Sequence, residues 1–351
     1  MRNGFTLIEF LIAVAILVIV SGAGLIGLSR YKGGQDIELS MEEIISVVRD
    51  VQKRSITEQD GKQWGIRFVN ASSSYEIWSG SSYASGTVDK LYSLRRNVIL
   101  GNPSTSTVDT IFSAISGKLA ETRIISLLNT RKDGIVGDIV MTERGTVTSR
   151  LEHGLVGYWH FDEATSTKAY DSSGFSITGT LTNGPTWQTS SNCKSGKCLS
   201  FDGTNDYVDL NASASYANTL TVTAWVFHNS ASGWDDIVAG GCGSILFGFS
   251  SNVLNFGGQC NNPFNPITYA TNINSAWHHV AGVYNGSTAS LYVDGTLVNS
   301  ASRSGSFSNF APNIGASGDS AESFYGSIDE VRIYNRALSA AEVLNLYNDL
   351  K

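Results

Sequence analysis

The chain has 351 residues, a formal net charge of −7 and only 16% charged residues, with 36 glycines and 5 prolines. At roughly 100–200 residues per domain, this length is enough for two or three folded units with their own cores. The acidic balance excludes a protein that binds nucleic acid through a basic surface, since none of the 24 Lys and Arg residues form a long run.

The first element that the sequence predicts is an apolar helix near the N-terminus. Residues 10–20 are all apolar, and the run extends from Phe5 to Leu28, with Arg2 before it and Arg30 behind it. At 1.5 Å per residue this run is ~36 Å long, which is enough to cross a bilayer. A cleaved secretory signal peptide is the alternative interpretation, because a basic start and small residues at 21–24 also suit it.

Glu9 argues against a signal peptide, because an acidic side chain inside such a run costs ~2.5–3.5 kcal/mol near the membrane centre. Residues 4–9 read GFTLIE, and they resemble the processing site of type IV pilins and type II secretion pseudopilins. The resemblance implies that a prepilin peptidase cuts after Gly4 and that Phe5 becomes the methylated N-terminus. It also implies that Glu9 faces the N-terminal amine of a neighbouring subunit. Residues 1–4 would then be the leader peptide, and residues 5–30 the transmembrane and assembly helix.

For residues 31–150 the sequence predicts an amphipathic helix followed by a small β-rich head. Apolar residues recur at helical spacing until about residue 58, where Asp60 and Gly61 end the pattern. Short strands are then predicted at residues 64–69, 75–78, 97–100, 124–128 and 137–141. This order resembles pilin-like proteins, and in particular the H-type pseudopilins.

The composition changes at about residue 154 to a segment rich in aromatic residues, Gly, Asn and Asp. Strands are predicted at residues 158–161, 199–201, 207–210, 220–228, 245–249, 277–284, 290–293, 296–299 and 327–334, a number that favours a two-sheet sandwich. Asp294 and Gly295 predict a type I′ hairpin turn. Ser339 and Glu342 predict a capping box at the start of a short final helix.

Five blocks in this half resemble the laminin-G-like branch of the concanavalin A-like lectin/glucanase superfamily: GLVGYWHFDE, CLSFDGTNDYVDL, LTVTAWV, SAWHHVAGVYNGSTASLYVDGTLV and YGSIDEVRIYNRALSAAEV. The expected fold class is therefore an α+β pilin-like part followed by an all-β jelly-roll sandwich over residues 154–351. The resemblance implies a module that binds carbohydrate or protein, or that serves as a spacer.

The four cysteines all lie in this half, at Cys193, Cys198, Cys242 and Cys260. Three connectivities are possible, and the local one, Cys193 with Cys198 and Cys242 with Cys260, is favoured because each pair closes a loop that contains glycine. Four buried free thiols are the alternative. Disulfides would place this half in an oxidising compartment.

Acidic pairs in the sandwich do not suggest a glycosidase. A retaining enzyme needs two carboxylates ~5–5.5 Å apart, and the candidates Asp329 with Glu330 and Asp162 with Glu163 are adjacent in sequence. Adjacent strand residues point to opposite faces, so neither pair is expected to flank one bond. The same argument disfavours a metal site at His278 and His279, and no enzymatic role is predicted.

A structural Ca²⁺ ion is the one cofactor considered, since calcium takes six to eight oxygen ligands. The resemblance implies Asp202 and Asp329 as ligands, with Asp162 and Asp171 as contributors; the alternative is that these aspartates cap turns. For a sugar ligand, the candidates are a stacking ring and nearby polar groups: Trp234, Asp235, Asp236, Asn261 and Asn262.

The sequence thus predicts a minor pilin or pseudopilin that displays a lectin-like module for adhesion or ligand recognition. Its partners would be other pilin subunits, the prepilin peptidase, the inner membrane, and a carbohydrate or surface protein. It would reside in the inner membrane before assembly and then at the cell surface or in an extracellular filament. A permanently anchored surface lectin is the main alternative, and a secreted glycan hydrolase is a weaker one.

Overall fold

The computed structural model describes residues 34–351 apart from short gaps, which are residues 70–71, 102–106, 115, 121–122, 130–134, 212–218, 230–232, 242–243, 259–264, 271–272, 306, 308–311 and 319–321. The GFTLIE motif and the apolar run therefore lie outside the described residues. Among the helices that are described, none is long and apolar enough to cross a membrane.

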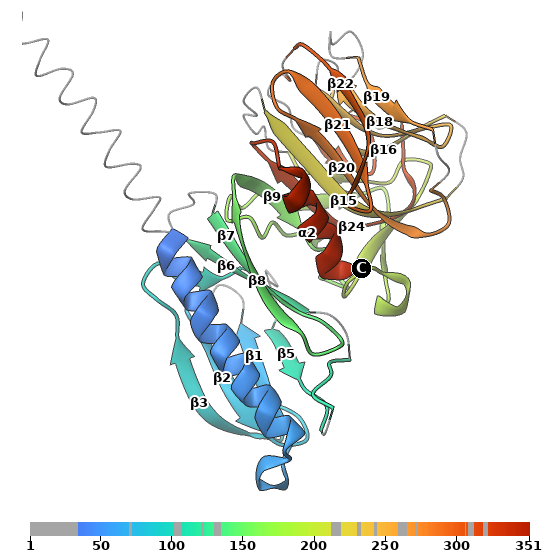
Figure 1. Ribbon diagram of the computed structural model, residues 1–351. Coiled ribbons are helices and arrows are strands. Elements are labelled where there is room, and N and C mark those ends of the chain that lie inside the picture. The colour runs from blue at the N-terminus through green and yellow to red at the C-terminus, as the bar shows by residue number, and fades with distance from the viewer. Residues whose placement is uncertain are drawn as a thin grey trace, which may run out of the picture.

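The first unit, the head, consists of a helix over residues 34–56 and two four-stranded antiparallel sheets (Figure 1). One sheet has the order β3 (Thr87–Ser93), β2 (Ser74–Ser79), β1 (Trp64–Val69), β5 (Thr107–Ile111). The other has the order β4 (Val98–Leu100), β6 (Arg123–Asn129), β7 (Ile135–Met141), β8 (Val147–His153). A 3₁₀ turn at Gln59–Gly61 follows the helix.

The helix of the head forms because its apolar residues recur on one side. Ile37, Met41, Ile44, Val48 and Val51 are buried, and they form one core with side chains from both sheets. Their burial removes a continuous apolar stripe from water, which stabilises the helix more than its intrinsic propensity does. The predicted amphipathic helix is confirmed, and it ends two residues earlier than expected.

The second unit is a two-sheet β-sandwich, as the sequence predicted. One sheet has the order β10 (Lys168–Ala169), β11 (Gly179–Thr182), β14 (Tyr207–Asp209), β23 (Asn313–Ile314), β16 (Trp234–Ala239), β17 (Ile245–Ser250), β18 (Val253–Gly258), β19 (Ile267–Tyr269). The other has the order β12 (Thr186–Gln188), β13 (Cys198–Asp202), β24 (Tyr325–Tyr334), β15 (Leu220–His228), β20 (Trp277–Tyr284), β21 (Thr288–Val293), β22 (Thr296–Ser302), and β9 (Leu155–Trp159) pairs with β24 beside this path. The two sheets enclose one apolar core. A 3₁₀ turn, Ser190–Asn192, precedes β13.

Two local predictions in the sandwich are confirmed. Asp294 and Gly295 join β21 to β22 with φ of 51° and 74°, the positive values that a type I′ turn requires. Helix α2 (Ala340–Leu350) begins with the capping box between Ser339 and Glu342. Strands that carry weak alternation were not predicted, among them β3, β8, β16 and β18.

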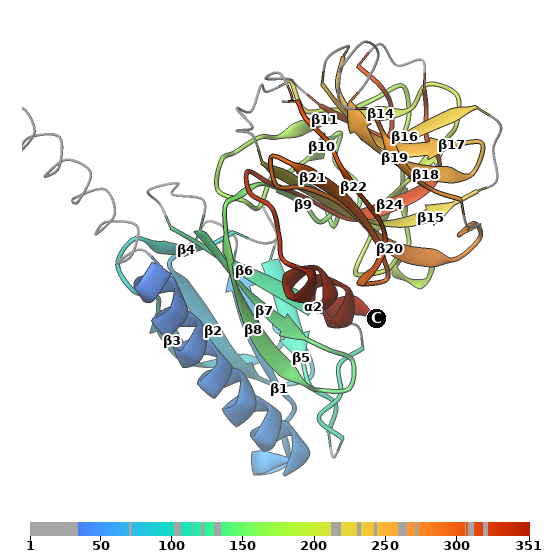
Figure 2. The ribbon, with the colours of Figure 1, turned by 45° about the horizontal axis from the view of Figure 1, so that its top comes forward.

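The head and the sandwich follow each other without a linker, since β8 ends at His153 and β9 begins at Leu155. Helix α2 lies between the two units in both views (Figures 1 and 2). Its Leu346 belongs to a cluster with Leu128 and Val136 of the head. Its Leu350 belongs to another with Ile124 and Val140. The outer face of the β24–β15–β20 sheet is thus covered by the head and by α2.

Candidate functional site at the junction of head and sandwich

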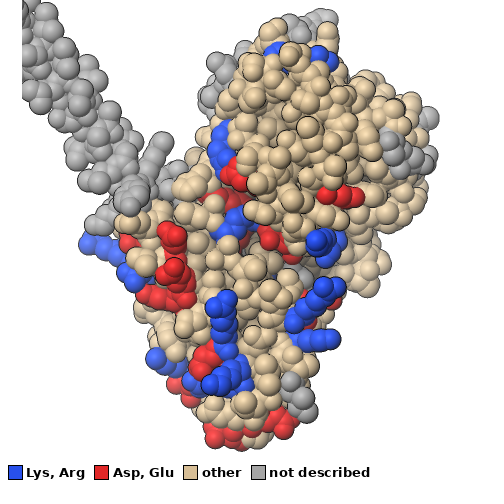
Figure 3. Space-filling model, viewed as in Figure 1, with Lys and Arg blue, Asp and Glu red and all other residues tan. Residues whose placement is uncertain are grey.

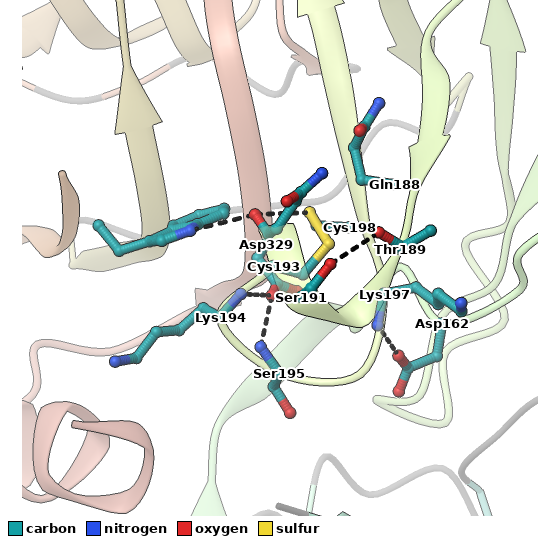
Figure 4. Close-up of a disulfide and its surroundings, with 12 residues drawn as sticks. Asp162, Gln188, Thr189, Ser191, Cys193, Lys194, Ser195, Lys197, Cys198 and Asp329 are labelled. Atoms are coloured by element: carbon teal, nitrogen blue, oxygen red, sulfur yellow. Dashed lines mark hydrogen bonds between the residues drawn. A yellow bond between two sulfur atoms is a disulfide. The ribbon is translucent and has the colours of Figure 1, made fainter. Parts of the chain in front are cut away.

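The disulfide loop, residues 193–198, is held by a covalent bond and by several hydrogen bonds (Figure 4). Cys193 and Cys198 are bonded, with their Cα atoms 5.4 Å apart, so this predicted disulfide is confirmed. Cys242 and Cys260 lie outside the described residues. The described cysteines include no free thiol.

Two aspartates hold the backbone of the disulfide loop. Asp329 Oδ2 accepts hydrogen bonds from the amides of Lys194 and Ser195, at 3.1 and 2.9 Å. Asp162 Oδ1 accepts one from the amide of Lys197 at 2.7 Å. Gly196 has a φ of 52°, and a Cβ there would collide with the Asp162 carboxylate. The loop is therefore fixed by a covalent bond, by two carboxylate acceptors, and by a left-handed position at which only glycine avoids a clash.

A bulge in β24 changes the expected direction of its acidic pair. Glu330 has a φ of 53°, and the pairing of β15 with β24 shifts register between Thr223 and Trp225. Strict alternation is lost at such a bulge. Glu330 accepts hydrogen bonds from Tyr158 and Arg332 outside the sandwich core. Burial raises the pKa of Asp329, and the nearby charge of Glu330 raises it further, so the two carboxylates lie on the same side of the strand. The expectation that these two carboxylates point to opposite faces is therefore wrong.

A groove of about 470 Å³, here called the junction groove, opens between the disulfide loop and the head. The head contributes Ala120 and Glu143 to its walls, and the sandwich contributes Ser190, Ser191, Lys194 and Ser195 together with the disulfide. Its size lies in the lower part of the ~300–1,000 Å³ range of small-molecule sites. The sequence did not suggest it, because its two walls are about 50 residues apart in the chain.

Lys194 occupies an unusual place in this groove. Its ammonium lies 4.1 Å from the centre of the Trp225 ring. Burial lowers the pKa of Lys194, although the negative charges of Asp294, Asp329 and Glu143 act to raise it. Among the described residues no carboxylate comes within ion-pair distance of it. Because the Trp225 ring and distant charges hold the Lys194 ammonium, its N–H groups are available to donate hydrogen bonds to another group.

Of the four predicted calcium ligands, Asp162 and Asp329 lie together at the disulfide loop, whereas Asp202 and Asp171 serve other turns. Asp202 pairs with Tyr325, four residues before Asp329 on β24, so roughly 13 Å of strand separates them. Asp202 instead caps a turn through the amide of Thr204, at 2.8 Å. Asp171 accepts from the amides of Tyr158, Ser173 and Ile177. The pairing of Asp202 with Asp329 on one ion is therefore wrong, because their carboxylates serve separate backbone donors.

Calcium binding as such stays a prediction. The described part of the chain contains no group of three or more His, Cys, Asp and Glu side chains arranged to hold a metal ion.

The predicted sugar site is only in part at the surface. Trp234 opens strand β16 with 38% of its surface exposed, whereas Asp235 and Asp236 are buried within that strand. Asp235 lies 3.0 Å from Nε2 of the buried His228. These two carboxylates are therefore not at the surface for a sugar, because they lie in the strand β16, which was not predicted. Asn261 and Asn262 lie outside the described residues.

Charged side chains and two tyrosines, most of them buried, lie between the two units, and we call them the junction network. They are Asp138, Arg150 and Glu152 of the head, and Tyr158, His160, Glu330, Arg332, Tyr334 and Asp349 of the sandwich and α2. Arg150 bonds Asp138 at 2.9 Å and also pairs with Asp349 of α2. Tyr334 donates to Glu152 at 2.5 Å. Polar bonds therefore cross the junction at several points, and the Arg336 guanidinium adds one to the carbonyl of His153.

The network sets the charge of its members. Burial alone would raise the pKa of Glu330, but the charges of His160 and Arg332 lower it to about 2. Burial and the charge of Glu152 raise the pKa of Asp138, against the effect of Arg150. The ion pair of Glu330 and His160 is 3.1 Å long and almost fully buried. Breaking one partner of such a pair leaves an uncompensated charge in the interior.

Comparisons with known families agree with the two resemblances. Residues 1–25 match the model of the prokaryotic N-terminal methylation motif, and residues 202–344 match that of the concanavalin A-like lectin/glucanases superfamily. The chain thus joins a pilin-like N-terminus to a concanavalin A-like domain. The motif implies prepilin processing, membrane anchoring and pilin assembly. No curated protein matches the chain.

Solved structures with similar folds are distant in sequence. The binding domain of Paraclostridial Mosquitocidal Protein 1 is 18% identical, with a TM-score of 0.45 over 56% of this chain and 52% of that one. Domain 4 of AbnA, a GH43 extracellular arabinanase from Geobacillus stearothermophilus in complex with arabinotriose, is 20% identical, with a TM-score of 0.46 over 55% of this chain and 98% of that one. The chain spans about half the length of the first of these relatives.

Proposed function

We propose that this protein is a minor pilin or pseudopilin that presents a lectin-like module outside the cell, for adhesion or ligand recognition. The observation that carries the proposal is the way in which the module is attached. The sandwich is docked on the head through apolar clusters and the junction network, and only Gly154 separates the strands of the two units. A head held in a filament would therefore present the sandwich in one orientation.

The position of the subunit follows from its size. The sandwich adds roughly as much chain as an average domain to each head. We propose a tip or low-copy position, since such an appendage on every subunit would crowd a helical filament. A permanently anchored surface lectin is the second candidate, and Glu9 discriminates between them because a lone anchor gains nothing from a buried acid.

We also propose a binding role without catalysis. The acidic pair Asp329 and Glu330 is fully buried, and both side chains already serve the disulfide loop or the junction network. A glycosidase pair must instead reach a substrate and a water molecule.

The test of the filament role begins with the N-terminus of the mature protein. Mass spectrometry should find a methylated Phe5 at the N-terminus. If residues 1–4 were retained, or if the chain were cut near Gly24, the proposal would be contradicted.

A second test replaces Glu9. In competition with the wild type, Glu9→Ala should enter filaments poorly, because it leaves the amine of the neighbouring subunit without a carboxylate to pair with. Glu58→Ala, which removes an exposed acid just after the head helix, should compete equally.

A further inference from the structure

The exposed side of the head helix carries four charged side chains in one line, which we call the charge strip. They are Glu38, Glu42, Arg49 and Lys53, and all four are exposed. Successive residues of a helix are rotated by roughly 100°, so these four positions fall within roughly 60° of one another around the axis. The two acids come first along the strip and the two bases follow. Figure 3 shows acidic side chains over the beginning of this helix and basic ones farther along it.

The charge strip makes no ion pair with the described part of the chain, whereas other charges of the same helix are paired. Glu43 pairs with Arg95, and Arg54 pairs with Asp50 and with Asp89. None of the four strip residues forms an ion pair with a described residue. The charges of the strip are therefore available to another molecule.

The order of charges in the strip is unfavourable for the helix itself. Glu38 and Glu42 are four residues apart, as are Arg49 and Lys53, so each pair places like charges on neighbouring turns. Like charges at this spacing destabilise a helix, whereas opposite charges at the same spacing, as around Arg54, stabilise it. Helix stability therefore does not explain the two blocks of charge, and a contact with a surface of the opposite pattern would account for them.

A second copy of the chain carries that opposite pattern when it is displaced along the helix axis. Arg49 follows Glu38 by 11 residues, and Lys53 follows Glu42 by the same number. Copies that are anchored by their N-termini in one membrane have parallel helices, so without a displacement like charges would face each other. A displacement of 11 residues, ~16.5 Å at 1.5 Å per residue, brings both acids of one copy opposite both bases of the other.

We propose that the charge strip binds a second copy of this chain, which lies side by side with the first and is displaced by ~16.5 Å along the helix axis. This inference rests on the proposed assembly of membrane-anchored subunits, and it adds a contact and a register to that assembly. Exposed ion pairs contribute little individually, but here they act between partners whose effective concentration the membrane already raises. The contact leaves one pair of acids and one pair of bases free at its ends, where further subunits can attach.

The experiment measures energy transfer between donor- and acceptor-labelled copies of the full chain in phosphatidylcholine vesicles, with fluorescent proteins fused through a flexible linker after Lys351. One variant combines Glu38→Lys with Glu42→Lys, and the other combines Arg49→Glu with Lys53→Glu. Each variant gives the strip a single sign, so transfer among copies of the same variant should fall at least roughly twofold. Transfer in the wild type should also fall when the salt concentration rises from about 50 to about 500 mM.

A mixture of the two variants should restore the transfer, and so should one chain with all four reversals, because acids again face bases. The matched control combines Glu58→Lys with Glu143→Lys, at two exposed acids of the head that lie off the strip. It changes the net charge by as much as the reversal of the two strip acids does, and its transfer should equal that of the wild type.

Equal transfer in the wild type and in both single-sign variants would overturn the inference. So would a mixture that does not recover the transfer although circular dichroism shows both variants folded, or wild-type transfer that salt does not lower. These results leave the filament role intact, since processing after Gly4 and the Glu9→Ala competition decide that role separately. Transfer that follows the charge reversals in a chain that is not processed would instead support the contact and remove the filament role.

Discussion

Glu163 shows how a single side chain couples this fold to pH. It follows β9, where Oε1 accepts a hydrogen bond from the Tyr170 amide at 2.8 Å. Its Oε2 is buried and has no hydrogen-bond partner in the described part of the chain. Burial raises the pKa of Glu163 to about 7, against the effect of the Tyr170 amide. The native state therefore holds this proton at a pH at which the unfolded chain has lost it.

Replacement of Glu163 by Gln should change the pH dependence of stability. A raised native pKa contributes stability that is complete below the ordinary pKa near 4.5 and is lost as the pH rises through 7. Glu163→Gln cannot ionise, so it should match the wild type at about pH 4 and exceed it by roughly 1–3 kcal/mol at pH 8. Urea unfolding of residues 34–351 at both pH values measures this.

Glu58→Gln is the control, because Glu58 is exposed. Equal pH slopes for Glu163→Gln and the wild type would mean that Glu163 ionises in the native protein as freely as in the unfolded chain.

At the scale of elements, the β17–β18 hairpin bears on the second disulfide. Ile245 pairs with Gly258 at the open end of this hairpin, and these two residues follow Cys242 and precede Cys260 closely in the sequence. The described ladder thus brings the two chain segments into neighbouring strands. The local pairing of Cys242 with Cys260, which was chosen from the sequence, stays a prediction that this hairpin favours.

We expect the oxidised full chain to contain two disulfides and no free thiol. Titration of thiols in denaturant without reductant should find none, whereas two reactive thiols would show that Cys242 and Cys260 are unpaired. In the chain-entropy model the longer Cys242–Cys260 loop stabilises the fold by on the order of 3 kcal/mol, and the Cys193–Cys198 loop by on the order of 2 kcal/mol. Paired Cys→Ser variants in urea unfolding should follow this order.

At the scale of the whole molecule, the two units behave as one body because their junction is buried. Asp138 and Arg332 are almost fully buried there, and Arg150 connects the head sheet to α2. The isolated sandwich would expose the outer face of the β24–β15–β20 sheet, including Trp225 and Tyr334. Binding studies are therefore better made with the head present.

Arg150→Met should weaken both the head and its contact with the sandwich. The change leaves Asp138, Glu152 and Asp349 without their shared cation, and loss of one partner from a buried ion pair costs ~3–5 kcal/mol. Calorimetry of residues 34–351 should show a lower melting temperature and a separation of the head and sandwich transitions.

Arg144→Met is the matched control, since Arg144 is exposed in the same β7–β8 hairpin. If Arg150→Met melted as Arg144→Met does, the junction network would contribute nothing to the coupling of the two units.

The sequence by itself determined the features that depend on local pattern. The amphipathic helix, strands such as β1, β15 and β20, the type I′ turn at Asp294 and the capping box at Ser339 follow from hydrophobic period, backbone preference and short-range hydrogen bonds. The two family resemblances and the Cys193–Cys198 disulfide rest on residues that are close together in the chain.

Only the tertiary structure decided which distant residues meet. The separation of Asp202 from Asp329 depends on strand register, and the shared face of Asp329 and Glu330 depends on a bulge that alternation does not foresee. The buried strand β16 lacks a clear period of two, so the sequence did not reveal that its aspartates are buried. The junction network and the junction groove arise from the docking of two units, and no local pattern records that contact.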